Sequence, residues 1–127
     1  MTSVAVFAAI LFVGMAAFQL SLALGAPLGA HVLGGRQSGT LPNRLRAASV
    51  VAAAILVGCA LVILARAGAI GWPTGATGVL APGAWGIAGY LLLNTLGNLA
   101  SKSRLERTVF AAITATLAVL SGLVALS

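Results

Sequence analysis

Few side chains in this sequence could carry acid–base, nucleophilic or metal chemistry. Its 127 residues include one acidic side chain, Glu106, one histidine, His31, and one cysteine, Cys59. Paired-carboxylate catalysis needs two acidic groups, and a Ser-His-Asp triad needs an aspartate, which the chain lacks. A zinc site needs three or four ligands, and these three residues are expected at different depths. We therefore predict no enzymatic activity, no metal site and no cofactor.

His31 is the one imidazole side chain in the chain. An imidazole titrates near neutral pH, so His31 could act as a single ligand, as a sensor, or as the centre of lipid or quinone chemistry. It lies in a stretch with glycines at positions 25, 29, 34, 35 and 39. A hydrogen bond to a backbone carbonyl, with no further role, is the interpretation that we prefer.

A stripe of polar residues marks the third apolar run. Gly86, Tyr90, Asn94 and Asn98 recur every four residues and therefore share one face of a helix. Amides are unfavourable against lipid and turn inward to bond a neighbour. The expected partners in the other runs are Gln19, Ser21, Ser49, Thr114, Thr116 and Ser121. Hydrogen bonding between helices is the first interpretation, and a ligand or permeation path lined by Gln19, Tyr90, Asn94 and Asn98 is the second.

Four apolar runs must position these residues, approximately at 4–24, 47–65, 83–100 and 108–126. A helix of about 20 residues crosses the hydrocarbon core of a bilayer, and lipid requires each backbone to bond within its own helix. The chain is 61% hydrophobic and 6% charged, whereas a soluble domain is about 25% charged. We predict an all-α, polytopic membrane protein, with residues 1–127 forming a single four-helix transmembrane domain.

The positive charges are distributed very unevenly between the loops. Loops 25–46 and 101–107 contain six of the seven basic residues: Arg36, Arg44, Arg46, Lys102, Arg104 and Arg107. Only Arg66 borders the remaining loop, 66–82. The positive-inside rule places both basic loops in the cytoplasm, and both termini then lie outside. The charges are thus expected to orient the protein, with anionic lipid head groups as a possible contact, and not to bind nucleic acid.

A helix-start signal precedes the fourth run. Ser103-Arg-Leu-Glu106 matches a capping box, in which Ser103 accepts from the N–H of residue 106 and Glu106 accepts from the N–H of Ser103. An ion pair between Glu106 and Arg44 or Arg46 is the competing role.

The two basic loops also carry a family resemblance. Gly25-Ala-Pro-Leu-Gly29, Gly34-Gly-Arg36, Leu41-Pro42 with Arg44 and Arg46, and Ser101-x-Ser-Arg-x-Glu-Arg107 follow one another along the chain. This pattern resembles an uncharacterised family of small membrane proteins from high-GC, actinobacterial-type bacteria. The resemblance implies a four-helix, multi-pass protein of the plasma membrane and supplies no activity.

Two functions follow as hypotheses. The first is a non-enzymatic accessory or scaffold subunit, which would contact other membrane-protein subunits or further copies of itself. The alternative is a small-solute or ion pathway that a homo-oligomer builds, with Gln19, Asn94 and Asn98 lining it.

Overall fold

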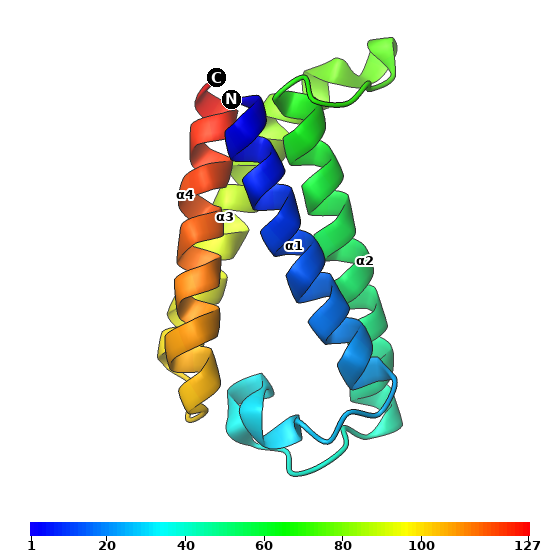
Figure 1. The fold of residues 1–127 in the computed structure, drawn as a ribbon, viewed down its shortest axis with the longest axis vertical. Helices are drawn as coiled ribbons and strands as arrows, with labels where there is room; N and C mark the ends of the chain where they lie inside the picture. The colour runs from blue at the N-terminus through cyan, green and yellow to red at the C-terminus, as the bar shows by residue number, and fades with distance from the viewer.

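The computed structural model describes residues 1–127 and contains four long helices and no strand. These are α1 (Thr2–Ala23), α2 (Asn43–Arg66), α3 (Leu80–Leu99) and α4 (Ala111–Leu126), which run side by side as a bundle (Figure 1). Together with the short helical turns that precede α3 and α4, all four are long and apolar enough to cross a membrane. The predicted four-helix membrane fold is therefore confirmed.

Shorter helical segments occupy the connections. Two 3₁₀ turns, η1 (Gly29–His31) and η2 (Leu33–Gly35), lie between α1 and α2. A third, η3 (Thr74–Val79), leads into α3, and a π-helical turn, η4 (Glu106–Phe110), leads into α4.

Two of the helices extend beyond the apolar runs that predicted them. α2 begins at Asn43 and not at Ala47, because Arg44 and Arg46 interrupt the hydropathy without interrupting the helix. α3 begins at Leu80 and not at Gly83. Pro42 lies just before α2, with φ −64° and ψ 158°. Hydropathy identifies the segment of a helix that can lie in the hydrocarbon core of a bilayer. The helix itself can extend beyond that segment at either end.

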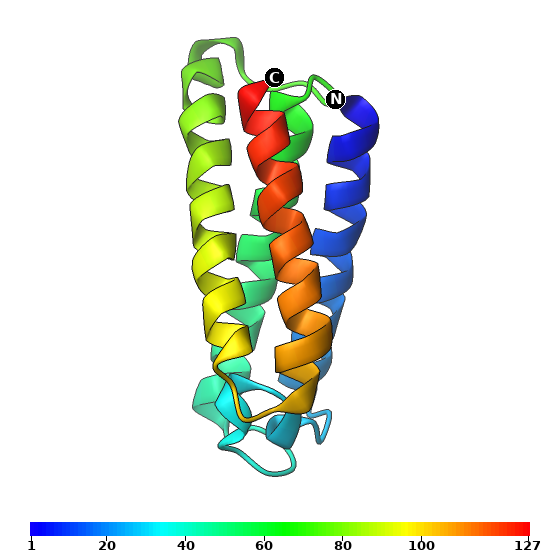
Figure 2. The same cartoon turned by 90° about the vertical axis from the view of Figure 1, so that its left-hand side faces the viewer.

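The bundle has two different ends (Figures 1 and 2). Both termini and the 67–79 connection lie at one end, which we call the terminal end. Loop 24–42 and the short 100–103 connection lie at the other, which we call the basic end because six of the seven basic residues belong to it.

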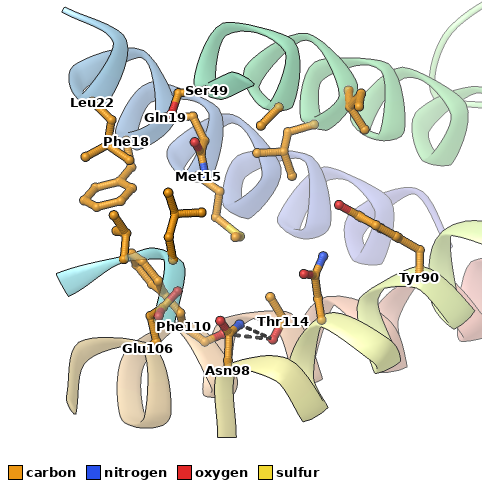
Figure 3. Close-up of a pocket in the computed structure, with 16 residues that line it drawn as sticks. Met15, Phe18, Gln19, Leu22, Ser49, Tyr90, Asn98, Glu106, Phe110 and Thr114 are labelled. Atoms are coloured by element: carbon orange, nitrogen blue, oxygen red, sulfur yellow. Dashed lines mark hydrogen bonds between the residues drawn. The ribbon is translucent and has the colours of Figure 1, made fainter. Parts of the chain in front are cut away.

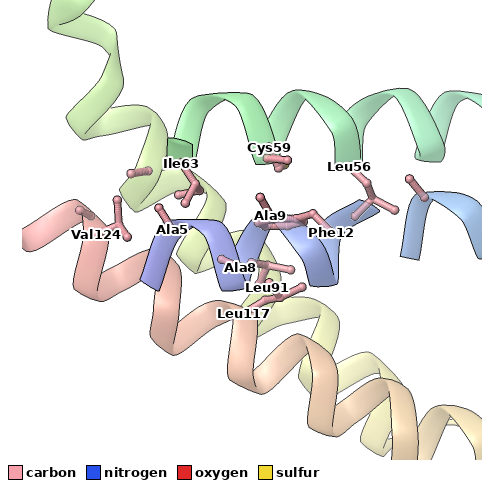
Figure 4. Close-up of a cluster of buried hydrophobic side chains, with 14 of the residues drawn as sticks. Ala5, Ala8, Ala9, Phe12, Leu56, Cys59, Ile63, Leu91, Leu117 and Val124 are labelled. Carbon is pink, nitrogen blue, oxygen red and sulfur yellow. The ribbon is translucent and has the colours of Figure 1, made fainter. Parts of the chain in front are cut away.

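The helices associate as two hairpins, α1 with α2 and α3 with α4, and contacts between the hairpins are fewer. Where the hairpins do meet, the core contains many alanines. Ala5 and Ala8 are fully buried beside Phe12, Ile63 and Val124 in one cluster that extends toward the terminal end (Figure 4). Small side chains let membrane helices approach closely enough for van der Waals packing to hold them together.

One side-chain contact ties α2 to α4 at the terminal end. The Arg66 guanidinium donates through Nη2 to the carbonyl oxygen of Ala125 (3.3 Å) and to that of Ser127. A cation at the C-terminal end of a helix also interacts favourably with the helix dipole.

Loop 24–42 folds back on itself and against the end of α1. The Gly29 N–H donates to the Gly39 carbonyl (2.8 Å), and a Cβ at position 29 would lie 2.6 Å from that oxygen. Only glycine therefore fits at this position without a backbone shift. Val32 and Leu41 are buried against Leu22 in a second, smaller apolar cluster, which fixes the loop to the end of α1.

Candidate functional site

A cavity of about 200 Å³ separates the two hairpins toward the basic end (Figure 3). All four helices, η4 and loop 24–42 contribute to its lining. The side from α1 and α2 is largely apolar and includes Met15, Phe18, Leu22, Ala52, Ile55 and Leu56. The side from α3, η4 and α4 is largely polar and includes Tyr90, Asn94, Asn98, Glu106 and Thr114. An apolar wall thus faces a polar wall across the cavity.

Part of the polar wall is used to hold α3 against α4. The Thr95 hydroxyl lies 2.9 Å from the Thr114 hydroxyl, and the Asn98 amide donates to Thr114 Oγ1 at 3.4 Å. Thr114 also donates to the carbonyl of Phe110, the last residue of η4 (2.9 Å). Asn98 therefore has the helix-linking role that was the first interpretation of the polar stripe.

Four other polar side chains in the lining form no hydrogen bond within the chain. They come from three helices: Gln19 from α1, Ser49 from α2, and Tyr90 and Asn94 from α3. Ser49 is only 5% exposed, and Gln19 and Asn94 are half-buried. A buried amide or hydroxyl without a partner costs free energy, and lipid cannot supply one. These groups can therefore bond a polar molecule that enters the cavity.

The rim of the cavity shows where such a molecule would enter. Ile55 on α2 and Tyr90 on α3 line it and are each 50% exposed. At the α1–α4 side the rings of Phe18 and Phe110 meet edge to face, with centroids 5.0 Å apart. Aromatic contacts of this kind are favourable, so this side is held closed. On the four long helices, the most exposed lining residues are thus on α2 and α3.

Loop 24–42 forms the floor of the cavity and is hydrogen-bonded to the 100–103 connection and to the start of η4. Glu106 Oε1 accepts from the Gly34 N–H (2.8 Å) and from the Ser101 hydroxyl (2.6 Å). The Ser103 hydroxyl donates to the His31 carbonyl (2.7 Å). Gly34 has φ +77°, a conformation that glycine adopts at little cost. The single carboxylate of the chain thus links segments that are 72 residues apart.

The predicted capping box is formed only in part. Ser103 Oγ accepts from the Glu106 N–H at 3.3 Å, as predicted. The Ser103 N–H, however, donates to Ser101 Oγ (3.0 Å) and not to the Glu106 carboxylate. Ser101 lies close enough to serve that N–H, which leaves the carboxylate for Gly34. This correction makes Glu106 a contact between loop 24–42 and the second hairpin.

The basic residues lie outside the cavity lining. Arg46 Nε donates to the Ala23 carbonyl (2.9 Å), so the proposed partner of Glu106 serves the end of α1 instead. Arg107 Nη1 donates to the carbonyls of Ser101 (3.0 Å) and Lys102 (2.8 Å). The other members of the predicted basic surface are exposed: Arg36, Arg44, Lys102 and Arg104.

His31 has an exposed side chain, and its backbone carbonyl makes the contact with Ser103. No three His, Cys, Asp or Glu side chains gather anywhere in the chain. A role for the imidazole as ligand or sensor stays a prediction.

Comparison with known proteins gives no further guide, because no protein-family model, curated protein or solved structure matches the chain. The resemblance of the two basic loops to a bacterial membrane-protein family stays a prediction as well.

Proposed function

We propose that the protein is a non-enzymatic accessory protein of the bacterial plasma membrane that holds an amphipathic molecule between its two hairpins. One observation carries this proposal. Four polar side chains without partners in the chain, Gln19, Ser49, Tyr90 and Asn94, converge on one cavity with an apolar wall. Such a site suits a ligand with a polar head and an apolar remainder.

The dimensions of the cavity agree with a ligand that is only partly enclosed. A cavity of about 150 Å³ holds benzene, so the 200 Å³ here accommodates a group of about ring size. The polar head would occupy this volume. The apolar remainder would leave between α2 and α3, past Ile55 and Tyr90, and lie among the lipid chains.

The charge distribution supports an orientation with the basic end in the cytoplasm. Gln19 lies four residues before the end of α1, and Asn94 lies five before the end of α3. At 1.5 Å per residue, both are about 6–8 Å from the basic end. The head group would then sit in the cytoplasmic leaflet. The loop resemblance is the support for a bacterial membrane.

The titratable groups favour holding the ligand over converting it. Among the cavity residues only Glu106 and Tyr90 have ionisable side chains, and the Glu106 carboxylate is hydrogen-bonded into the floor. General acid–base catalysis needs groups free to exchange a proton with the substrate near neutral pH.

The alternative, a pathway built by a homo-oligomer, draws less support. Toward the terminal end Phe12, Ile63 and Leu117 are fully buried in the apolar core. This packing closes the interior of a single chain. Asn98, one of the residues proposed to line a pathway, bonds Thr114 of its own hairpin.

Mass spectrometry of the purified protein tests the proposal. Ala52 lines the cavity, whereas Ala54 on the same helix is exposed away from it. Protein purified in mild detergent should retain one amphipathic species far above its share of the membrane extract. Ala52→Phe, which fills the cavity, should reduce that species about tenfold, and Ala54→Phe should retain it.

Equal retention by both variants, or lipids in the proportions of the bulk membrane, would overturn the binding proposal. The accessory role has its own readout in the same preparation. Purification as a lone species, with no co-purifying protein, would count against it.

A further inference from the structure

The chemistry of the lining also defines the kind of head group, an inference that rests on the proposed function. We infer that the cavity takes an amphipathic molecule with an uncharged head group that both donates and accepts hydrogen bonds. Hydroxyl and carbonyl groups, as in a glycerol ester, have this character. Phosphate and carboxylate heads are selected against.

The residues around the cavity include no arginine and no lysine. This is notable because six of the seven basic residues belong to the same end of the bundle. Proteins recognise phosphate and carboxylate groups chiefly with arginine and lysine. The cavity provides three amides and three hydroxyls instead, from Gln19, Asn94 and Asn98 and from Ser49, Tyr90 and Thr114.

The nearby guanidinium groups are also committed elsewhere. Arg46 donates to the Ala23 carbonyl, and Arg107 donates to the carbonyls of Ser101 and Lys102. Arg36 and Arg44 are exposed and do not line the cavity. An anionic head inside the cavity would therefore lack a cationic partner.

Glu106 is the one acidic side chain at the cavity, and it gives an anionic head no favourable partner. Its Oε1 already accepts from the Gly34 N–H and the Ser101 hydroxyl, and it lies in the first turn of its helix, so its field at the cavity is reduced for ions of either sign. A cationic head would therefore gain little there to offset the cost of removing its charge from water.

The free groups match an uncharged head in their hydrogen-bonding capacity. An amide offers two N–H donors and a carbonyl acceptor, and a hydroxyl offers one donor and two acceptor lone pairs. Gln19, Ser49, Tyr90 and Asn94 provide both kinds of partner. A head with several hydroxyl or ester oxygens can therefore satisfy them without bringing a charge into the membrane interior.

A comparison of the affinities of three single-chain lipids tests the inference. Monooleoylglycerol, oleoyl lysophosphatidic acid and oleylamine share one chain and differ in head charge. Each would be titrated into the delipidated protein in nonionic detergent, with the bound fraction read by native mass spectrometry. Monooleoylglycerol should bind at least about tenfold more tightly than either charged lipid, a difference of about 1.4 kcal/mol.

Asn94→Leu should weaken monooleoylglycerol binding about fivefold, because it removes the hydrogen bonds and keeps the volume. Asn43→Leu, an exposed change at the start of α2, should leave binding as it is.

The remaining outcomes separate the two proposals. Equal or tighter binding of lysophosphatidic acid would overturn the uncharged-head inference while leaving the binding function in place. Preferential binding of oleylamine would overturn it also. If none of the three lipids binds a protein that remains monodisperse and helical, the binding function itself is wrong.

Discussion

The terminal and basic halves of the bundle join the same four helices in different ways. In the terminal half Ala5 and Ala8 let the hairpins meet around Phe12. In the basic half the hairpins stand apart, and a cavity lies between them above the floor made by loop 24–42. One half is held by close van der Waals packing. The other depends on hydrogen bonds and on a loop that contacts both hairpins.

The difference fits the proposed binding function, which uses only the basic half. Polar side chains are expensive in lipid, so they occur where they can bond one another or a ligand. Thr95 and Asn98 both bond Thr114, whereas Gln19, Ser49 and Asn94 form no such bond. The terminal half should therefore be sensitive to added volume, and the basic half to lost hydrogen bonds.

The largest effect is expected from Ala8→Leu. Ala8 is 0% exposed in the same cluster as Leu91 and Leu117, so the added carbons have no free space (Figure 4). Overpacking of this kind should lower the free energy of unfolding by about 3 kcal/mol, measured by denaturation in a detergent mixture. Ala17→Leu, an exposed change on the same helix, is the control. Similar stability of the two variants would show that the terminal half is not closely packed.

A smaller effect is expected from Gly29→Ala, which tests the loop at the basic end. Its Cβ would lie 2.6 Å from the Gly39 carbonyl oxygen, so the backbone must move. We expect a loss of about 2 kcal/mol in unfolding free energy and faster proteolysis within loop 24–42. Gly71→Ala, in the loop at the terminal end, has open space around its Cβ and should change stability by less than about 0.5 kcal/mol. The comparison fails if the two substitutions have equal effects.

The smallest effect is expected from Glu106→Ala. It leaves the Gly34 N–H and the Ser101 hydroxyl without their acceptor, at a cost of about 1 kcal/mol because the site is only half-buried. Amide hydrogen exchange at Gly34 should speed up, while exchange in the terminal half of α1 stays slow. Glu106→Gln keeps an acceptor oxygen and should show a weaker effect. Unchanged exchange at Gly34 in Glu106→Ala would remove the role assigned to this carboxylate.

The helices could be predicted because lipid imposes one strong rule on them. A run of about 20 apolar residues must form a helix, so four runs predict four helices. The four-residue spacing of Tyr90, Asn94 and Asn98 predicted that they share one face of α3, and all three line the cavity. The stripe did not predict which residues of α3 are buried, because those are Leu80, Ala84, Leu91 and Thr95, whereas Tyr90 is half exposed. The apolar run predicts a helix from residue 47, whereas α2 begins at Asn43. Hydropathy excludes the first turn of α2 because Arg44 and Arg46 are charged.

The cavity could not be predicted, because it depends on which distant segments meet. Glu106 carried a local signal, and the capping box assigned it to Ser103. Its partner at Gly34 is set by how loop 24–42 folds, which no periodic pattern encodes. Gln19 and Ser49 were expected to bond the α3 stripe, yet they face it across the cavity without a bond. The separation of the two hairpins depends on how all four helices of the chain pack, so the sequence of one helix does not predict it.

The contact between Arg66 and the end of α4 has a consequence for how the bundle sits in a membrane. Arg66 is the one basic side chain at the terminal end, and its guanidinium donates to the carbonyls of Ala125 and Ser127. The charge distribution favours the basic end in the cytoplasm, and Arg66 is the one charge that opposes this orientation. Its bonds to α4 satisfy part of the guanidinium while leaving its charge in place. Packing of α4 beside α2 therefore lowers the cost of keeping Arg66 at the terminal end.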